Sequence, residues 1–232
     1  VYLFSYGPDD GKEIRKRAEV EGDKFVDLKG MGVERMAREI YRNKVDILID
    51  MMGFSGDAKP EVMVLRPAPV IVSYLGYPGT TAGMDDYIVT DKILTPKGEQ
   101  KFYGEKFIYL PRCYQVISKV SVGKRITREE VGLPERGIVW ASFNRAYKIE
   151  PEIFAVWMRI LKRVPEAVLW LSIPNEVARE NLLKEARRWG IEGQRLVWAK
   201  QCSYQDHLSR LRLADLALDT SIYNGGATSS DV

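Results

Sequence analysis

The chain has 232 residues, and its 35 Lys and Arg residues nearly balance its 32 Asp and Glu residues, so the formal net charge is only +3. Hydrophobic residues make up 45% of the sequence, which is enough for a packed core and excludes a disordered or collagen-like chain. The basic residues are spread along the sequence, so nucleic acid is not an expected partner. No apolar run approaches the roughly 20 residues of a membrane-spanning helix, so no membrane association is expected.

The two cysteines, Cys113 and Cys202, lie too far apart in the sequence to indicate a local disulfide framework or a metal pair. This cysteine usage favours a reducing, cytoplasmic compartment. The sequence begins on the apolar run VYLFSY without an initiator Met, and we interpret it as a piece of a longer protein.

In the first half of the chain, apolar runs rich in β-forming residues alternate with polar or helix-patterned segments. Strands are predicted over residues 1–6, 24–28, 45–50, 69–75 and 87–91, and helices over 13–21 and 33–43. The second helix has Val33, Met36 and Ile40 on one face. Because the strands are continuously apolar rather than alternating, they indicate a parallel sheet that is covered on both sides. The pattern weakens after Leu110, where a linker is predicted.

The second half begins a new series of the same kind. Strands are predicted over residues 137–143, 167–173, 195–200 and 216–220, and helices over 151–164, 177–189 and 204–213. The fold class is therefore α/β, with a doubly wound, Rossmann-like lobe at 1–112, a linker at 113–126 and a second such lobe at 127–232. In sheets of this kind, ligands bind outside the carboxyl ends of the strands, so the loops that follow strands are the candidates for function.

The loop after the last predicted strand is the most informative. Asn224, Gly225 and Gly226 form a glycine turn that leads into a helix start at 227–231. Backbone N–H groups at such a start bind phosphate, and the hydroxyls of Thr228 and Ser229 would add donors. Asp231 could either cap the helix or accept hydrogen bonds from a ribose. The alternative is an ordinary turn whose Ser and Thr residues only cap the helix.

Cations follow another strand of the same lobe. Arg145 and Lys148 would reach the same edge of the sheet, where Lys148 could neutralise the charge that develops on a diphosphate leaving group. The alternative is two solvated basic residues in a loop. The single histidine, His207, excludes a histidine-rich metal site within the chain, and no cysteine cluster or Asp-x-Asp pair is present. If phosphate is bound, we expect it to be bound without a metal.

A third loop, YLGYPGTTAG, is rich in glycine, which would let the backbone approach a ligand closely, although a long structural turn is the alternative. The familiar nucleotide motifs are missing. Neither G-x-G-x-x-G nor G-x-x-x-x-G-K-[ST] occurs after a strand, so a dinucleotide-binding enzyme and a P-loop NTPase are disfavoured.

Three long segments carry a family resemblance: LRPAPVIVSYLGYPGTTAGMDDYIVTD, FNRAYKIEPEIFAVWMRILKRVPEAVLWL and HLSRLRLADLALDTSIYNGGATSSD. In this order they resemble the catalytic region of the O-linked N-acetylglucosamine transferase family, which has bacterial members and includes the plant protein O-fucosyltransferase. The resemblance implies a two-domain GT-B fold, here truncated at both ends. It also implies inverting transfer of a sugar from a nucleotide diphosphate to Ser or Thr, without metal or other cofactor. UDP-GlcNAc or a related nucleotide sugar and a protein or peptide acceptor are the implied partners, and tetratricopeptide (TPR) repeats are expected in the full-length chain.

The resemblance also implies roles for donor-binding residues. Lys148 matches the family lysine that holds the donor diphosphate, and Arg145 stands where a Gln or Asn also faces it. His207 matches a histidine that stacks near the base, Arg210 a base-side arginine, and Asp231 an acidic residue that binds the ribose.

Two further groups of residues are assigned in the same way. Thr228 and the backbone N–H groups around Gly225 and Gly226 match a turn that cradles the phosphates. Gly76 and Tyr77 match the loop that lines the sugar and acceptor cleft.

The chain also departs from the family pattern. The run 224–228 reads NGGAT and lacks a histidine and one threonine found in relatives. Lys24 replaces a histidine near the acceptor, Tyr204 replaces a ribose-side lysine, and Tyr223 replaces a small residue beside the acetamido group. The sugar could therefore be GlcNAc, fucose or another hexose, and no general base is identified.

Three functions stay open at this point. The first is a UDP-sugar protein O-glycosyltransferase, or its GDP-fucose-using variant. The second is a non-catalytic module that binds a nucleotide or peptide on the same scaffold, and the third is a sugar-nucleotide epimerase on a related one. Because a helix after Asp231 would be needed to support the phosphate cradle, we expect the 232-residue piece alone to bind donor weakly.

Overall fold

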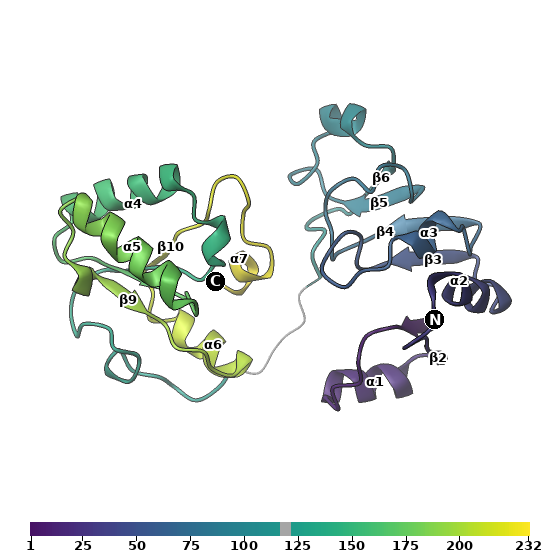
Figure 1. The fold of residues 1–232 in the computed structure, drawn as a ribbon, viewed down its shortest axis with the longest axis horizontal. Coiled ribbons are helices and arrows are strands. Elements are labelled where there is room, and N and C mark those ends of the chain that lie inside the picture. Colours follow the sequence, from purple (N-terminus) through teal and green to yellow (C-terminus); the bar gives the residue numbers. More distant parts are fainter. Residues whose placement is uncertain (117–121) are drawn as a thin grey trace. The chain divides into compact units, whose positions relative to one another are not determined.

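The structure of the protein is a computed structural model that describes residues 1–116 and 122–232 (Figure 1). The chain divides into two compact units, Val1–Val116 and Ile117–Val232. The predicted lobes 1–112 and 127–232 each fall within one unit. The predicted linker 113–126 includes residues 117–121, which lie outside the described residues.

The first unit consists of short parallel strands connected by helices and loops. Its elements are β1 (Tyr2–Ser5), α1 (Glu13–Glu21), β2 (Lys24–Asp27), α2 (Val33–Arg42), β3 (Ile47–Asp50), α3 (Glu61–Val64), β4 (Val70–Ser73), β5 (Tyr87–Thr90), the 3₁₀ helix η1 (Lys97–Phe102) and β6 (Lys106–Tyr109). The predicted strands and helices all form, with shorter ends. The edge strand β6, with the sequence KFIY, was not predicted.

The strands of this unit form two sheets rather than the single sheet that was expected. β1 pairs with β2, and β3, β4, β5 and β6 form a separate four-stranded sheet in that order, with parallel pairing throughout. A cavity of about 860 Å³ is lined by both β1 and β3, and in the described part of the chain no ladder joins these two strands. A common core still connects the two sheets, since Leu28 after β2 packs in one cluster with Met36 and Ile40 of α2 and Leu48 of β3.

The second unit follows the predicted alternation closely. Its elements are the 3₁₀ helix η2 (Glu129–Val131), β7 (Val139–Ser142), the 3₁₀ helix η3 (Ala146–Lys148), α4 (Pro151–Arg163), β8 (Val168–Leu171), α5 (Glu176–Arg188), the 3₁₀ helix η4 (Gly193–Arg195), β9 (Leu196–Trp198), α6 (Tyr204–Leu211), β10 (Leu216–Ala217) and α7 (Ala227–Asp231). Pro151 occupies the first turn of α4, as predicted. The parallel α/β architecture is thus confirmed in both units.

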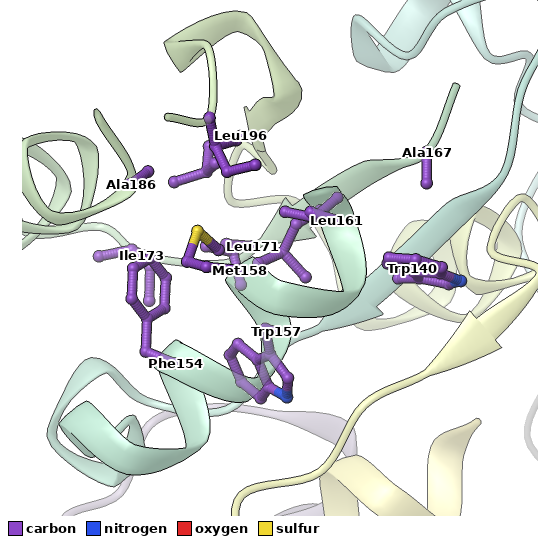
Figure 2. Packing of buried hydrophobic residues seen from close by; sticks show 12 residues of the cluster. Trp140, Phe154, Trp157, Met158, Leu161, Ala167, Leu171, Ile173, Ala186 and Leu196 are labelled. Carbon is purple, nitrogen blue, oxygen red and sulfur yellow. The ribbon is translucent and has the colours of Figure 1, made fainter. Parts of the chain in front are cut away.

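The sheet of the second unit is buried on both faces, as its continuously apolar strands predicted. One face packs against α4 and α5, and Figure 2 shows this layer with Phe154, Trp157, Met158 and Leu161 of α4 around the strand residue Leu171. The opposite face carries a second cluster of buried side chains, Leu133, Val139, Ala141, Val168, Trp170 and Ala199.

The strand order β10-β7-β8-β9 contains a reversal that determines where a ligand can bind. The chain runs from β7 through β8 to β9 in one direction, and β10 then returns to the other side of β7. The loops after β7 and β10 therefore leave the same edge of the sheet as neighbours. Ligands of doubly wound proteins bind at such a switch point.

The core layer of Figure 2 gives a test of the packing. Leu161 is fully buried, whereas the adjacent Ile160 is 38% exposed on the outer side of α4. Leu161→Ala should lower the free energy of unfolding by about 2–5 kcal/mol, because it leaves a cavity in a close-packed layer. Ile160→Ala is the matched control and should cost much less. Urea unfolding of both variants measures the difference, and equal losses would contradict this packing.

Candidate functional site

Hydrogen bonds join the loop after β7 to the loop after β10 at the switch point. The Lys148 Nζ donates to the Asn224 carbonyl at 2.8 Å and lies 3.9 Å from the centre of the Tyr223 ring. The structure thus brings the predicted lysine to the predicted glycine bend and adds Tyr223 beside it. Arg145 opens the same loop with an exposed side chain, and its guanidinium forms no ion pair within residues 1–116 and 122–232.

Two more contacts join these loops. The Asn144 amide donates to Asp219 Oδ1 at 2.8 Å. Glu150, just before α4, accepts hydrogen bonds from the Ser221 hydroxyl and from the Ile222 N–H, the latter at 3.1 Å. Three separate contacts therefore hold the loop after β10 against the loop after β7.

Asp219 is the most heavily bonded side chain of this site. In addition to Asn144, its Oδ1 accepts the N–H groups of Gly225 and Thr220, both at 2.8 Å, and its Oδ2 accepts the Ser229 hydroxyl at 3.1 Å. Burial alone would raise the pKa of Asp219, but these hydrogen bonds outweigh it and lower the pKa below the ordinary value. Asp219 is therefore a carboxylate at neutral pH.

These contacts correct two predictions for the glycine turn. The Gly225 N–H and the Ser229 hydroxyl, expected to face a phosphate, donate to Asp219 instead. Close packing accounts for the glycine at position 225, because a Cβ atom there would lie 2.3 Å from Ser229 Oγ. In the described part of the chain, the N–H groups of Gly226, Ala227 and Thr228 have no acceptor. The backbone donors that remain for a phosphate therefore lie one to three residues after Gly225.

His207 and Arg210, both in α6, form a hydrogen-bonded pair. His207 Nδ1 accepts from Arg210 Nη2 at 3.0 Å, so the ring proton is assigned to Nε2. Burial, and then the charge of Arg210, lower the pKa of His207, which is neutral at pH 7. The His207 ring also packs edge-on against Phe143, at 5.3 Å between ring centres.

Arg210, the residue predicted on the base side, makes its contacts within the protein. Its guanidinium is buried 5.0 Å from the Phe143 ring centre and donates to the Lys200 carbonyl as well as to His207. The structure therefore places Arg210 behind His207, as the group that orients it.

The two residues predicted on the ribose side are bonded to each other. The Tyr204 hydroxyl donates to Asp231 Oδ1 at 2.6 Å, and this bond raises the pKa of Tyr204. Asp231 is the last residue of α7, and the cap position of that helix is Gly226. Of the two roles left open for Asp231, capping is therefore excluded.

In the first unit, the predicted loop after β4 packs tightly against the loop after β3. A Cβ atom on Gly76 would lie 2.0 Å from the Met51 carbonyl oxygen, so only glycine fits there. The Tyr77 ring packs edge-on against Phe54, with 5.4 Å between ring centres.

Lys24 does not belong with these two residues. It begins β2, and its Nζ donates to Asn43 Oδ1 at 2.6 Å, just before β3 starts. Gly76 and Tyr77 follow the carboxyl end of β4, which runs parallel to β3. The prediction that Lys24 shares a cleft with Gly76 and Tyr77 is therefore wrong, because β3 lies between Asn43, which Lys24 contacts, and Met51, which Gly76 contacts.

A buried carboxylate anchors the loop that follows Tyr77. Glu105 is fully buried and accepts from the N–H and hydroxyl of Thr81, at 2.7 and 2.6 Å, from the Thr80 hydroxyl at 2.8 Å and from the Gly83 N–H at 3.0 Å. Burial would raise the pKa of Glu105, but these hydrogen bonds hold it below the ordinary value. The Thr81 hydroxyl also contacts Asp85 at 2.8 Å, where burial, with some repulsion from neighbouring carboxylates, raises the pKa to about 6.

The raised pKa of Asp85 predicts a stability change with pH. Because the folded chain holds this proton up to about pH 6 and the unfolded chain loses it near 3.8, stability should fall as the pH rises through this window. The loss attributable to Asp85 is roughly 3 kcal/mol. Asp85→Asn should remove it, which urea unfolding between pH 4 and pH 7 can measure relative to the unchanged chain.

Asp86 provides the control for this pH effect. Its pKa is lowered, mainly by the hydrogen bond from Arg66. Asp86→Asn should therefore lower the free energy of unfolding at pH values above about 4, where Asp86 is ionised, and should leave the fall in stability between pH 4 and pH 7 that is due to Asp85. The same pH dependence in the Asp85→Asn variant and the unchanged chain would contradict the assignment.

The site contains residues that were not predicted from the sequence. Asn144, Asp219 and Glu105 were missed, although each has a central place in the hydrogen bonding. A signal was present for two of them, because Asn144 lies two residues after β7 and Asp219 two residues after β10, which are adjacent strands. Polar residues at matching offsets after neighbouring parallel strands meet at one edge of a sheet.

Among residues 1–116 and 122–232, no group of three or more His, Cys, Asp or Glu side chains is arranged to hold a metal ion, and no helix has the length and apolar character to span a membrane. Cys113 and Cys202 are exposed free thiols.

Comparison with known proteins connects the geometry to a family. A protein of Arabidopsis thaliana named "Probable UDP-N-acetylglucosamine–peptide N-acetylglucosaminyltransferase SEC" is 34% identical over 240 residues, which cover all of this chain and 25% of that protein. The UDP-N-acetylglucosamine–peptide N-acetylglucosaminyltransferase of Caenorhabditis elegans is 23% identical over 347 residues and is covered to 30%. The chain thus spans about a quarter of the length of these relatives.

A solved structure matches the whole fold. A mutant of the O-GlcNAc transferase of Thermobaculum terrenum superposes with a TM-score of 0.87 at 28% identity, and the match covers 100% of this chain and 44% of that one. The fold is therefore that of the catalytic region of an O-GlcNAc transferase, of GT-B type. The family model "Glycosyl transferase family 41" matches residues 1–122 and 115–232, and these two stretches include every residue of the sequence. The chain belongs to glycosyl transferase family 41.

Proposed function

We propose that the protein containing this chain transfers N-acetylglucosamine from UDP-GlcNAc to Ser or Thr hydroxyls of proteins, with inversion at the anomeric carbon. The observation that carries the proposal is the contact of Lys148 with the Asn224 carbonyl, which fixes an amine at the bend after β10 in a family 41 chain. A cation and unpaired N–H groups at the switch point of a parallel sheet suit a nucleoside diphosphate.

The chemistry needs no covalent nucleophile on the enzyme. The acceptor oxygen forms a bond to the anomeric carbon and gives up its proton to water, while the bond from that carbon to the diphosphate oxygen breaks and UDP leaves with the electron pair. The protonated amine of Lys148 would exchange the Asn224 carbonyl for a phosphate oxygen and stabilise the charge that develops there. The free N–H groups of Gly226, Ala227 and Thr228 would provide further donors.

The remaining donor contacts follow from the same arrangement. His207, neutral and with its proton on Nε2, is suited to stacking beside a base. The exposed guanidinium of Arg145, which forms no ion pair among the described residues, would be a further cation for the diphosphate. Tyr204 and Asp231 could both turn toward a ribose. Tyr223 lies next to Lys148 and would line the sugar side of the donor site.

The names of the relatives favour GlcNAc as the sugar. The proteins from Arabidopsis and Caenorhabditis are both named for transfer of N-acetylglucosamine from its UDP derivative, so they do not support the GDP-fucose alternative. A protein acceptor, TPR repeats elsewhere in the full-length chain and a cytoplasmic location complete the proposal, the last supported by the two free thiols.

Lys148→Ala tests the proposal directly. Loss of a charge-assisted hydrogen bond should weaken UDP binding to the full-length protein by about ten- to a hundredfold. Turnover with UDP-GlcNAc and a peptide acceptor should fall by two or more orders of magnitude. Isothermal titration with UDP and a transfer assay measure the two effects.

Lys162→Ala is the matched control, because Lys162 is an exposed lysine in the last turn of α4 in the same unit. It should leave UDP binding and turnover unchanged. Unchanged binding in the Lys148→Ala variant would remove the role assigned to that amine. UDP binding without any transfer to peptide would favour the non-catalytic module instead.

The proposed mechanism also predicts independence from divalent metal. Because Lys148 and backbone donors would carry the diphosphate charge, turnover of the full-length protein dialysed against EDTA should stay within about twofold of the untreated value. Loss of activity that Mg²⁺ or Mn²⁺ restores would show that a metal carries that charge instead.

A further inference from the structure

We propose that Asp219 is a positioning residue of the donor site, which fixes the Asn224–Gly225 bend against Lys148. This inference rests on the proposed function, since it concerns how the same site is held ready for a diphosphate. Asp219 would touch neither the nucleotide nor the reacting atoms. It would act through the loop.

Asp219 accepts hydrogen bonds from several different groups of the site. One carboxylate accepts from two backbone N–H groups within the loop, from the Asn144 amide on the neighbouring loop and from the Ser229 hydroxyl in α7. Asp219 therefore joins the stretch from Thr220 to Ser229 to Asn144, which lies 75 residues away in the sequence. Hydrogen bonds to a charged acceptor are the strong ones in proteins, so this junction should define the loop conformation.

The bend also has a defined position relative to Lys148. The Gly225 N–H bonds to Asp219, and the carbonyl of the preceding residue, Asn224, accepts the Lys148 amine at 2.8 Å. Asp219 thus holds one side of the Asn224–Gly225 peptide and Lys148 contacts the other. If the Asp219 contact is lost, the peptide can rotate, and the amine loses its fixed place.

The negative charge of Asp219 is also compatible with a neighbouring diphosphate. A free carboxylate next to a diphosphate would repel it, but all the contacts of Asp219 are with neutral donors, and these disperse its charge. No ion pair joins Lys148 to Asp219 among the described residues, so the lysine charge is left for a ligand. The acidic residue therefore organises the site without neutralising its cation.

Asp215 offers a matched control at the other end of the same strand. It precedes β10, and its Oδ2 accepts the Val139 N–H at 2.8 Å and an Arg128 N–H at 3.2 Å. Asp215→Ala, like Asp219→Ala, removes a carboxylate that joins β10 to the β7 region. It does so away from the glycine bend.

The experiment compares Asp219→Ala, Asp219→Asn and Asp215→Ala in the full-length protein. Asp219→Ala should weaken UDP binding by about tenfold or more and should speed hydrogen exchange of the Gly225 amide by about tenfold or more. Asp219→Asn keeps an acceptor oxygen and should recover most of both. Asp215→Ala should lower the melting temperature about as much as Asp219→Ala, yet leave UDP affinity within about twofold of the unchanged protein.

Two outcomes would overturn the inference. One is UDP affinity of the Asp219→Ala variant within about twofold of the unchanged protein. The other is equal loss of affinity in Asp219→Ala and Asp215→Ala, which would reduce Asp219 to a purely structural role. If the unchanged protein itself fails to bind UDP, the proposed function fails, and the exchange of the Gly225 amide still decides whether Asp219 fixes the bend.

Discussion

The candidate site depends on one constraint, the return of β10 to the free side of β7 in a parallel sheet. This return makes neighbours of two loops that are about 70 residues apart in the sequence. The loops are then joined by the contacts of Asn144 with Asp219, of Lys148 with Asn224 and of Glu150 with Ile222. A lysine and a glycine turn meet only because the sheet has this order.

The donors of the glycine turn divide into two groups with different tasks. The Gly225 N–H and the Ser229 hydroxyl are used within the protein, where Asp219 accepts them. The N–H groups of 226–228 find no acceptor in the part of the chain that the structure describes. A similar division separates Arg210, which is buried and orients His207, from His207 itself. In both cases, a buried or fully bonded group supports one that is left free for a ligand.

Much of this could be predicted from the sequence, for physical reasons that also explain the errors. Continuous apolar strands, Pro151 at a helix start and a glycine turn after a strand are local signals, and they located the two α/β lobes and the loop of Lys148. The edge strand β6, the division of the first unit into two sheets and the carboxylate junction at Asp219 depend on contacts between distant segments. Lys24 was misplaced because the family pattern gave its position in the sequence but not its place in the separate β1–β2 sheet, next to Asn43.

A crystal structure of the full-length protein with UDP tests the central claim most directly. We expect Lys148 Nζ to leave the Asn224 carbonyl and to lie within about 3.2 Å of a phosphate oxygen, with the Gly225 N–H still bonded to Asp219. A diphosphate bound elsewhere, with the lysine still on Asn224, would contradict it.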